Sequence, residues 1–310
     1  MKIDKLLNEN PYSLSRDQKK NLFSKKINEL TRFHRIRCKE YKKIIDFFGF
    51  ENKKNYELIN LPFLPVQIFK EFDLISTDKK NIVKILRSSG TSSSHTSKIF
   101  LDKKNSLEQV KALKTIVQYH IGTKRLPMLI IDKKSSIINS KDFDAKKAAF
   151  FGFSIFGKDF FYLIKENGEI DYKGLNIFLK ESNKSFFIFG FTYPVYNILY
   201  NKLIKKNLKN NFSKGILIHG GGWKKMEKVS ISNKKFKSDL RKKLNLKNIY
   251  NYYGLVEQTG SIFLECNCGY FLSTNFSEVL MRNENFELSK KSEKGFVQLI
   301  SLLPSSYPGH

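Results

Sequence analysis

Small hydroxylated residues surround a glycine in the stretch LRSSGTSSSHTSKIFLD, residues 86–102. Apolar residues lead into this stretch and an extended run leads out, which predicts a strand, a loop and a strand. Gly90 would let a ligand approach the backbone, and hydroxyl and N–H groups are donors for phosphate oxygens. The two glycines and the ending of a Walker A loop are absent. The stretch predicts either a polyphosphate site, to which Lys98 adds a cation, or a flexible surface loop.

Three consecutive glycines follow a later apolar run. Residues 216–218 are Ile-Leu-Ile, and His219 then precedes Gly220, Gly221, Gly222 and Trp223. Ligands of open α/β sheets bind at the carboxyl ends of the strands, so glycines at this place would admit a flat ring or a phosphate. The alternative is a plain turn from a strand to a helix.

A single carboxylate lies among aromatic residues after another expected strand, at 249–251. The segment reads YYGLVEQTG, residues 252–260, and contains Tyr252, Tyr253 and Glu257. Aromatic faces can sandwich a base, and Mg²⁺ prefers one or two carboxylates together with substrate oxygens. Glu257 is therefore a candidate Mg²⁺ ligand, and a structural glutamate is the alternative.

Helices and strands alternate between these motifs. Helical spacing covers residues 1–60, where Ser13 or Ser15 would cap the first long helix. After the serine-rich loop, Asn105 or Ser106 would cap a helix. Its inward residues would be Leu107, Val110, Leu113, Ile116 and Val117.

Further along, strands are expected at 127–131, 186–189, 215–219 and 249–251, helices at 141–149, 174–180, 196–208 and 238–244, an apolar run at 150–156, and short strands at 261–264, 270–273, 277–281 and 295–302. This order predicts an α/β fold with a mostly parallel sheet and flanking helices, an N-terminal helical segment and a small β-rich C-terminal part. We expect three parts, at 1–60, 61–265 and 266–310.

Composition narrows the function classes. The 310 residues are 41% apolar, an ordinary value for a globular protein, and the formal net charge is +27. The lysines are dispersed along the chain, so nucleic-acid binding is not favoured. Three cysteines do not predict a disulfide framework, and Cys266-x-Cys268 lacks the second ligand pair of a zinc site. Neither a signal peptide nor a membrane span is predicted, and we expect a soluble cytoplasmic protein.

Three segments occur in an order that resembles the acyl-adenylate-forming enzymes. They are SSGTSSSHTSKIFLD at 88–102, HGGGWKK at 219–225 and YYGLVEQTGSIF at 252–263. LPFLPVQIFKEFDLIS at 61–76 and the terminal LPSSYPGH are similar to the acyl-protein synthetase (LuxE) family, which is related to phenylacetate-CoA ligase. The resemblance implies the large lobe of an adenylate-forming enzyme.

The resemblance also implies an activity and a set of residues. The enzyme would use ATP and Mg²⁺ to activate a fatty acid as acyl-AMP, and would then pass the acyl group to a thiol of a partner protein such as an acyl reductase. Thr91 and Glu257 would be catalytic, and Glu257 would bind Mg²⁺. The positions implied for ATP binding are Ser88, Ser89, Gly90, Thr91, Ser92, Lys98, Gly220, Gly221, Gly222, Tyr252, Tyr253, Gly254 and Gln258.

The sequence departs from the family at several positions. Ser93 replaces a second loop glycine, Val256 replaces a threonine of broader relatives, and Lys98 is about two positions from their loop lysine. The chain ends at His310, where the family continues with a small lobe that carries the acyl-accepting cysteine, so we expect a large lobe without its small lobe. Two alternatives stay open: a carboxylate–CoA ligase of the phenylacetate-CoA ligase type, and a non-catalytic lobe that binds nucleotide or nucleic acid.

Phenylalanines between positions 150 and 191 could line an apolar tunnel for the acyl chain, with residues 190–192 as a wall near the carboxylate. Ordinary core packing is the alternative, and it is favoured for most of these side chains. The residues in question are Phe150, Phe151, Phe153, Phe156, Phe160, Phe161, Phe187, Phe189 and Phe191.

Overall fold

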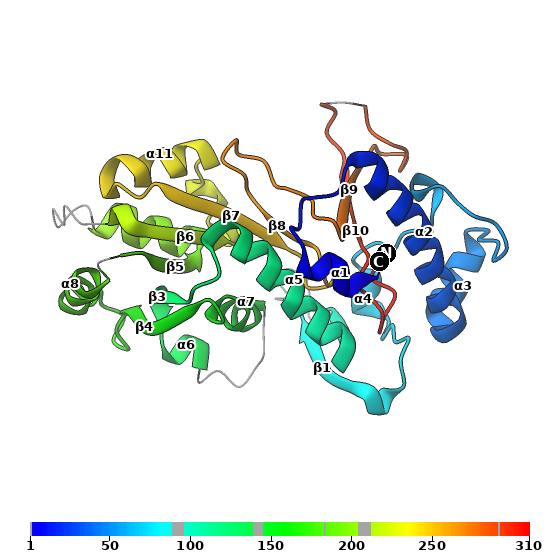
Figure 1. Cartoon of the computed structure of the whole chain (residues 1–310), viewed down its shortest axis with the longest axis horizontal. Coiled ribbons are helices and arrows are strands. Elements are labelled where there is room, and N and C mark those ends of the chain that lie inside the picture. Colours follow the sequence, from blue (N-terminus) through cyan, green and yellow to red (C-terminus); the bar gives the residue numbers. More distant parts are fainter. Residues whose placement is uncertain (1, 89–95, 139–144, 183, 204–211, 291) are drawn as a thin grey trace. The chain divides into compact units, whose positions relative to one another are not determined.

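A computed structural model describes residues 2–88, 96–138, 145–182, 184–203, 212–290 and 292–310 of the chain (Figure 1). The chain forms two compact units. Unit 1 comprises Met1–His120, Gly254–Ile262 and Ser273–His310, and unit 2 comprises Ile121–Tyr253 and Phe263–Leu272. In the described part of the chain, none of the helices combines the length and the hydrophobicity needed to cross a bilayer.

Unit 2 is built on a six-stranded sheet with the strand order β4-β3-β5-β6-β7-β8. The strands from β4 through β7 are parallel to their neighbours, as the sequence predicted. The central strand β5 reads FFIFGF, and its first five residues are buried, which is typical of a strand covered on both faces. The strands are β3 (Leu126–Lys133), β4 (Gly157–Ile164), β5 (Phe186–Phe191), β6 (Gly215–Gly220), β7 (Asn248–Gly254) and β8 (Ile262–Leu264).

Helices cover both faces of this sheet, with α11 and α7 on opposite sides of the strands (Figure 1). Ile188 and Leu217 pack with Leu240 of α11 in one buried core. Because successive side chains of a strand alternate between faces, Phe189 points the other way. Its ring lies 4.8 Å from that of Phe153 in α7. The helical segments of unit 2 are α6 (Ser135–Ile138), α7 (Ala145–Ser154), α8 (Tyr172–Glu181), α9 (Thr192–Val195), η3 (Tyr196–Lys202), η4 (Phe212–Lys214), η5 (Lys224–Val229) and α11 (Asn233–Leu244).

Unit 1 begins with helices and contains two antiparallel hairpins. Ser15 caps the long helix α2, because its hydroxyl accepts the Gln18 N–H and the Gln18 side chain accepts the Ser15 N–H. Strands β1 and β2 pair on either side of the serine-rich loop, and β9 pairs with β10. The elements are α1 (Ile3–Asn8), α2 (Arg16–Arg37), α3 (Lys39–Phe47), η1 (Leu58–Asn60), α4 (Ile68–Glu71), η2 (Lys79–Asn81), β1 (Ile82–Arg87), β2 (Lys98–Asp102), α5 (Lys103–Ile121), β9 (Ser277–Arg282) and β10 (Phe296–Ser301).

The predicted start of α5 is wrong. The Asp102 carboxylate accepts the Asn105 N–H at 2.8 Å, so Asp102 takes the place expected of Asn105 or Ser106. Two residues expected to face inward, Leu107 and Val110, are 52% and 48% exposed. The helix instead buries a face that contains polar side chains: Asn105, Glu108, Ala112, Leu113, Ile116 and Val117.

Two other predictions differ from the structure. The apolar run at 150–156 lies largely in helix α7, and the strand that follows it, β4, was not predicted. Residues 270–273 contribute an isolated bridge between Glu265 and Phe271 rather than a strand. Residues 204–208 of a predicted helix and 141–144 of another lie outside the described residues.

Candidate functional site

The carboxyl ends of β5, β6 and β7 meet at one edge of the sheet in unit 2. Phe191 pairs with Gly220, and Gly220 pairs with Tyr252. A Cβ atom at Gly220 would lie 2.5 Å from the Tyr252 ring, so this position requires glycine. Gly221 and Gly222 have φ angles of 75° and 59°, which L side chains rarely adopt. The triple glycine therefore forms a tight turn that brings backbone groups to the edge of the sheet.

The two adjacent tyrosines of β7 have different surroundings. The Tyr252 ring lies 4.8 Å from that of Phe153 and 6.3 Å from that of Phe189, and burial raises the pKa of its hydroxyl. Tyr253 is 45% exposed, and its ring lies 6.3 Å from that of Phe271. Of the predicted adenine-binding pair, Tyr253 therefore has the accessible ring.

A buried histidine supports the glycine turn, and this role was not predicted from the sequence. The Thr192 hydroxyl donates to the Gly220 carbonyl at 3.0 Å, and it lies 3.0 Å from His219 Nδ1. Because the hydroxyl proton goes to Gly220, His219 must donate from Nδ1. Burial lowers the pKa of His219 to about 3, so the ring is neutral. Thr192 and His219 thus fix the end of β6 by uncharged hydrogen bonds.

A small open pocket lies at the carboxyl ends of β3 and β5. Its polar side is an ion pair between Asp132 and Lys146, with Oδ2 and Nζ 2.6 Å apart. The remaining lining is aliphatic and aromatic: Ile130, Ile131, Ile137, Phe150, Phe189, Gly190 and Phe191. Phe191 is the residue that pairs with Gly220, so the pocket adjoins the glycine turn.

Glu257, in unit 1, is a buried carboxylate. It is 5% exposed, and no described residue donates a hydrogen bond or forms an ion pair with its side chain. Its carboxylate oxygens are not sealed from solvent, so a cation could reach them. The described residues contain no group of three or more metal-ligating side chains. One carboxylate completed by substrate oxygens suits Mg²⁺, so this residue fits the predicted ion.

Hydrogen bonds from distant segments hold the backbone just after Glu257. The Thr259 N–H donates to the Tyr307 hydroxyl at 2.8 Å, and the Asn105 amide donates to the Thr259 hydroxyl at 3.1 Å. The Gly260 N–H donates to the Gln109 side chain at 2.6 Å. Sequence reasoning missed these residues, although Tyr307 lies in the terminal LPSSYPGH motif.

Comparison with protein families identifies the chain. The profile described as "Acyl-protein synthetase, LuxE" matches residues 1–310. The chain belongs to the LuxE family. A comparison with proteins of curated function finds no significant match.

Two solved structures share the fold of this LuxE-family chain. An open conformation of 2-hydroxyisobutyryl-CoA ligase, in complex with 2-HIB-AMP and CoA, has a TM-score of 0.66 at 11% identity. The match covers 97% of this chain and 67% of that chain. The same ligase in its thioesterification state gives a TM-score of 0.67 at 9% identity, over 95% of this chain and 62% of that chain. The chain thus has the large-lobe fold of an adenylate-forming ligase and spans about two thirds of that enzyme's length.

The predicted site residues of the LuxE-family chain are divided between the two units. Unit 2 contains Gly220, Gly221, Gly222, Tyr252 and Tyr253, and the strand register brings Gly220 to Tyr252. Unit 1 contains Ser88, Lys98, Gly254, Glu257 and Gln258. Ser89, Gly90, Thr91 and Ser92 lie outside the described residues. The assembly of the whole set into one ATP site stays a prediction.

Three of the predicted residues in unit 1 have partners within the protein. The Ser88 hydroxyl accepts the Ser97 N–H at 3.0 Å and closes the base of the serine-rich loop. Lys98 pairs with Asp73 at 3.2 Å, and both side chains are partly exposed. The Gln258 amide donates to the Leu299 carbonyl at 2.9 Å, and Ser261 donates to its side-chain oxygen. Gln258 is therefore engaged in holding its own segment.

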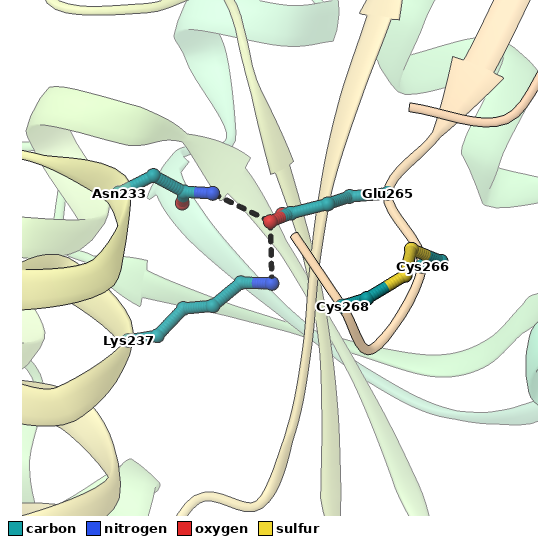
Figure 2. The surroundings of a disulfide bond; sticks show 5 residues. All are labelled: Asn233, Lys237, Glu265, Cys266 and Cys268. Atoms are coloured by element: carbon teal, nitrogen blue, oxygen red, sulfur yellow. Dashed lines mark hydrogen bonds and ion pairs between the residues drawn. A yellow bond between two sulfur atoms is a disulfide. The ribbon is translucent and has the colours of Figure 1, made fainter. Parts of the chain in front are cut away.

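Cys266 and Cys268 form a disulfide that the sequence did not predict (Figure 2). The bond closes a turn directly after Glu265. Figure 2 shows Asn233 and Lys237 extending from α11 to the Glu265 carboxylate. The third cysteine, Cys38, is buried with its thiol unbonded to another cysteine.

Proposed function

We propose that this chain activates a carboxylic acid with ATP and Mg²⁺ as an acyl-adenylate and passes the acyl group to a thiol on another protein. The observation that carries the proposal is the register from Phe191 through Gly220 to Tyr252. It puts an apolar pocket beside a glycine turn at the carboxyl edge of a parallel sheet, where ligands of such sheets bind. Membership of the LuxE family supports the same activity.

The nucleotide would bind through the glycine turn and the exposed ring of Tyr253. Gly221 and Gly222 are exposed, and a Cβ atom at Gly222 would meet nothing within 4 Å, so a ligand could approach the backbone there. The phosphates would bind the serine-rich loop, including Thr91, with Ser88 at its base and Lys98 beside it. These roles follow from the residue types, which are donors and a cation.

The chemistry requires charge stabilisation more than a base. The acid is already ionised at pH 7, and its carboxylate can attack the α-phosphorus directly. Negative charge then builds on the departing pyrophosphate, where Mg²⁺ would neutralise it. Glu257 would hold this ion, because its buried carboxylate has no partner among the described residues. Hydrogen-bond donors of the serine-rich loop, held in position before the reaction begins, would stabilise the same charge.

The acyl acceptor in this proposal is a thiol outside the chain's three cysteines. Cys38 is 1% exposed, and Cys266 and Cys268 are bonded to each other. An acyl-accepting protein, such as an acyl reductase, would supply the thiol. Coenzyme A is the second candidate, because the solved ligase with this fold was crystallised with CoA.

Pyrophosphate exchange tests the first half-reaction. The full-length protein is incubated with Mg-ATP, labelled pyrophosphate and a panel of carboxylic acids, and label entering ATP is measured. Glu257→Gln should lower the rate of exchange by at least about a hundredfold, because removing one preorganised charge-stabilising group typically lowers kcat by that factor. Glu284→Gln, which changes an exposed carboxylate of the same unit, is the matched control and should keep full exchange. Absence of exchange with every acid, in folded wild-type protein, would contradict the proposal.

The acceptor is tested separately. With a labelled acid that supports exchange, transfer to a partner protein appears as labelled protein that neutral hydroxylamine releases, as expected for a thioester. Consumption of CoA without protein labelling would instead favour the carboxylate–CoA ligase.

A further inference from the structure

Unit 2 contains a covalent feature that the proposed function does not use, the disulfide between Cys266 and Cys268 (Figure 2). We propose that this bond is a thiol–disulfide exchange site for a dithiol reductant, and that the bonded form holds the aromatic surface around Tyr253 in position for the nucleotide. The second half of the proposal rests on the proposed function, because it assigns regulation to the nucleotide site. Three features support it: the exposure of the turn, the fixed position of its first arm and the aromatic ring on its second arm.

The disulfide lies in an exposed turn. Residues 267–271 are exposed, and Cys268 is more exposed than Cys266, which is half-buried. Exchange requires that a thiolate reach a sulfur atom, and exposed disulfides are among those that are reduced readily. Cys38 provides the contrast within this chain, because it is 1% exposed. A reductant in solution would therefore react at 266–268 and leave Cys38 untouched.

The exchange transfers two electrons to the disulfide. A thiolate of the reductant attacks Sγ of Cys268, the more exposed residue, and the S–S bond breaks so that Cys266 leaves as a thiolate. The second thiolate of the reductant then attacks its own sulfur in this mixed disulfide and releases Cys268. Both cysteines take up the protons that the two thiols of the reductant have lost. The chain thus gains two thiol groups, and the reductant becomes a disulfide.

The first arm of the turn is attached to the interior of unit 2. Glu265 directly precedes Cys266, and its carboxylate binds side chains of α11. The Glu265 N–H donates to the Asn251 carbonyl at 2.9 Å. Cys266 therefore has a fixed position, and the disulfide holds Cys268 against it. Gly269 follows with a φ angle of 90° and reverses the direction of the chain.

The second arm places an aromatic ring beside Tyr253. The Cys266 N–H donates to the Tyr270 carbonyl at 2.8 Å, and Phe271 forms an antiparallel bridge with Glu265. The Phe271 ring lies 6.3 Å from that of Tyr253, and the two side chains are 46% and 45% exposed. The turn closed by the disulfide thus positions a neighbour of the ring that is proposed to contact adenine.

Reduction removes the covalent restraint on Cys268 and leaves the backbone hydrogen bonds of the turn in place. Exposed turns with few buried contacts belong to the least stable parts of a fold, so residues 267–271 gain conformational freedom. The nucleotide must then order the Phe271 ring when it binds, which lowers its affinity. The coupling is reciprocal, because bound nucleotide makes the disulfide harder to reduce by the same factor. We expect a factor of about five, at the lower end of the usual range.

Thiol labelling tests the exchange site by itself. The full-length protein is equilibrated in mixtures of dithiothreitol and its oxidised form, treated with N-ethylmaleimide in the native state, and digested for mass spectrometry. Cys266 and Cys268 should gain two alkyl groups together in reducing mixtures and none in oxidising mixtures, while Cys38 gains none in either. Free thiols at 266 and 268 in fully oxidised dithiothreitol, or a bond that excess dithiothreitol leaves intact, would overturn the inference.

The same titration with and without Mg-ATP measures the coupling. Saturating Mg-ATP should move the midpoint to a more reducing potential by about 20 mV, which is a fivefold effect at about 30 mV for each tenfold change. Calorimetry should find ATP bound about fivefold more weakly by the reduced protein. The double variant Cys266→Ser/Cys268→Ser should show this weaker binding in every buffer, and Cys38→Ala should respond to reduction as the wild type does.

Phe271→Ala tests the ring that connects the turn to Tyr253. The disulfide should still form in this variant, and the shift of its midpoint by ATP should disappear. Tyr270→Ala is the matched control, because Tyr270 is 74% exposed and contributes to the turn through its carbonyl, which the change retains. Circular dichroism establishes that both variants fold. Loss of the shift in both variants would overturn the role given to Phe271.

Failure of the inference and failure of the proposed function give different results. Reversible labelling in protein that neither binds ATP nor exchanges pyrophosphate would contradict the proposed function and the regulation of its site, and would still support the exchange site. Equal ATP affinity and equal pyrophosphate exchange in the oxidised and reduced forms would overturn the regulatory role of the disulfide and leave acyl-adenylate formation intact.

Discussion

The Lys237 ammonium lies 2.8 Å from Oε1 of Glu265, and both side chains are buried, at 8% and 1% exposure. Asn233 donates to the same oxygen at 2.6 Å (Figure 2). The Asn251 N–H donates to Oε2 at 3.2 Å. Both oxygens of the Glu265 carboxylate therefore have hydrogen-bond partners. Helix α11 and the segment after β8 are joined through this one group, next to the strand that leads to Tyr253.

Removing one partner of this ion pair should be strongly destabilising. Lys237→Met leaves a buried carboxylate without its cation, and we expect a loss of about 3 kcal/mol in the free energy of unfolding, measured in urea. Lys235→Met is the control, because Lys235 is 57% exposed and forms a surface pair with Asp239. It should cost under about 1 kcal/mol. Equal effects of the two changes would contradict a special role for the buried pair.

The disulfide next to Glu265 should contribute little to stability. A bond that closes a loop of three residues restricts the unfolded chain only slightly, by about 1.5 kcal/mol. The turn also has backbone hydrogen bonds of its own, from Cys266 to the Tyr270 carbonyl and from Gly269 to the Cys266 carbonyl. The variant with serine at both cysteines, unfolded in urea, should lose no more than this. A loss of about 4 kcal/mol would show that the bond supports more than the turn.

The sequence predicted those parts of the fold whose signals are local. The Ser15 cap, the strands on both sides of the serine-rich loop and the parallel strands of unit 2 follow from side-chain period and turn residues. A turn at Gly220–Gly222 was one of the two readings of its residues, and the binding of a ring or phosphate there stays a prediction. The family resemblance pointed to Glu257, which the structure shows as a buried carboxylate without a described partner.

Features that depend on tertiary contacts were not predictable. Asparagine is a residue type that often caps helices. In α5, however, Asn105 is buried and forms hydrogen bonds with residues almost two hundred positions away. Leu107 and Val110 are exposed because that helix turns a polar face inward. The aromatic run at 150–156 could equally be a buried strand or a buried helix, since a short apolar run has no distinguishing period.

Asn105 should be the most sensitive of these tertiary contacts. It is fully buried, donates to the Thr259 hydroxyl and the Leu303 carbonyl, and accepts from Ser306. Asn105→Ala should cost about 3 kcal/mol, because several buried groups lose their partners together. Tyr307→Phe removes a single hydroxyl from the Thr259 N–H and should cost about 1–2 kcal/mol.

Both changes should also lower pyrophosphate exchange in protein that is still folded, because they loosen the backbone that carries Glu257. The effect should appear in kcat with KM for the acid unchanged, since the pocket proposed for the acid lies in unit 2. Asn275→Ala is a useful control: it also removes a buried hydrogen-bonding amide from unit 1, at the N-terminal segment. A loss of exchange that simply follows stability across all three variants would contradict a positioning role.

Stability should fall in mild acid. His34 donates to the Pro304 carbonyl and accepts from Ser76, and burial lowers its pKa to about 3. Burial lowers the pKa of His219 similarly and that of His310 well below its usual value. The unfolded chain binds protons below pH 6.5 while these native rings stay neutral. The stability that the three rings contribute is therefore complete above pH 6.5 and is lost as the pH falls toward 3. At pH 5 the rings of His34 and His219 should each lower the free energy of unfolding in urea by about 2 kcal/mol. A flat profile between pH 5 and 7 would contradict this.

The carboxyl group of Glu108 should affect the pH dependence of stability in the direction opposite to that of the histidines. Burial raises the pKa of this carboxyl to about 7, and Lys104, 4.0 Å away and largely exposed, offsets little of that cost. The native state therefore keeps a proton between pH 4.5 and 7 that the unfolded chain has released, and stability falls as pH rises through this window. Glu108→Gln stays neutral throughout, so it should be more stable than wild type by about 2 kcal/mol at pH 8, with the advantage disappearing below pH 4.5. Urea unfolding at pH 4.5, 6 and 8 measures the difference, with Glu284→Gln as a surface control that should show none. A variant less stable than wild type at pH 8 would mean that the Glu108 carboxylate has a partner that compensates for its burial.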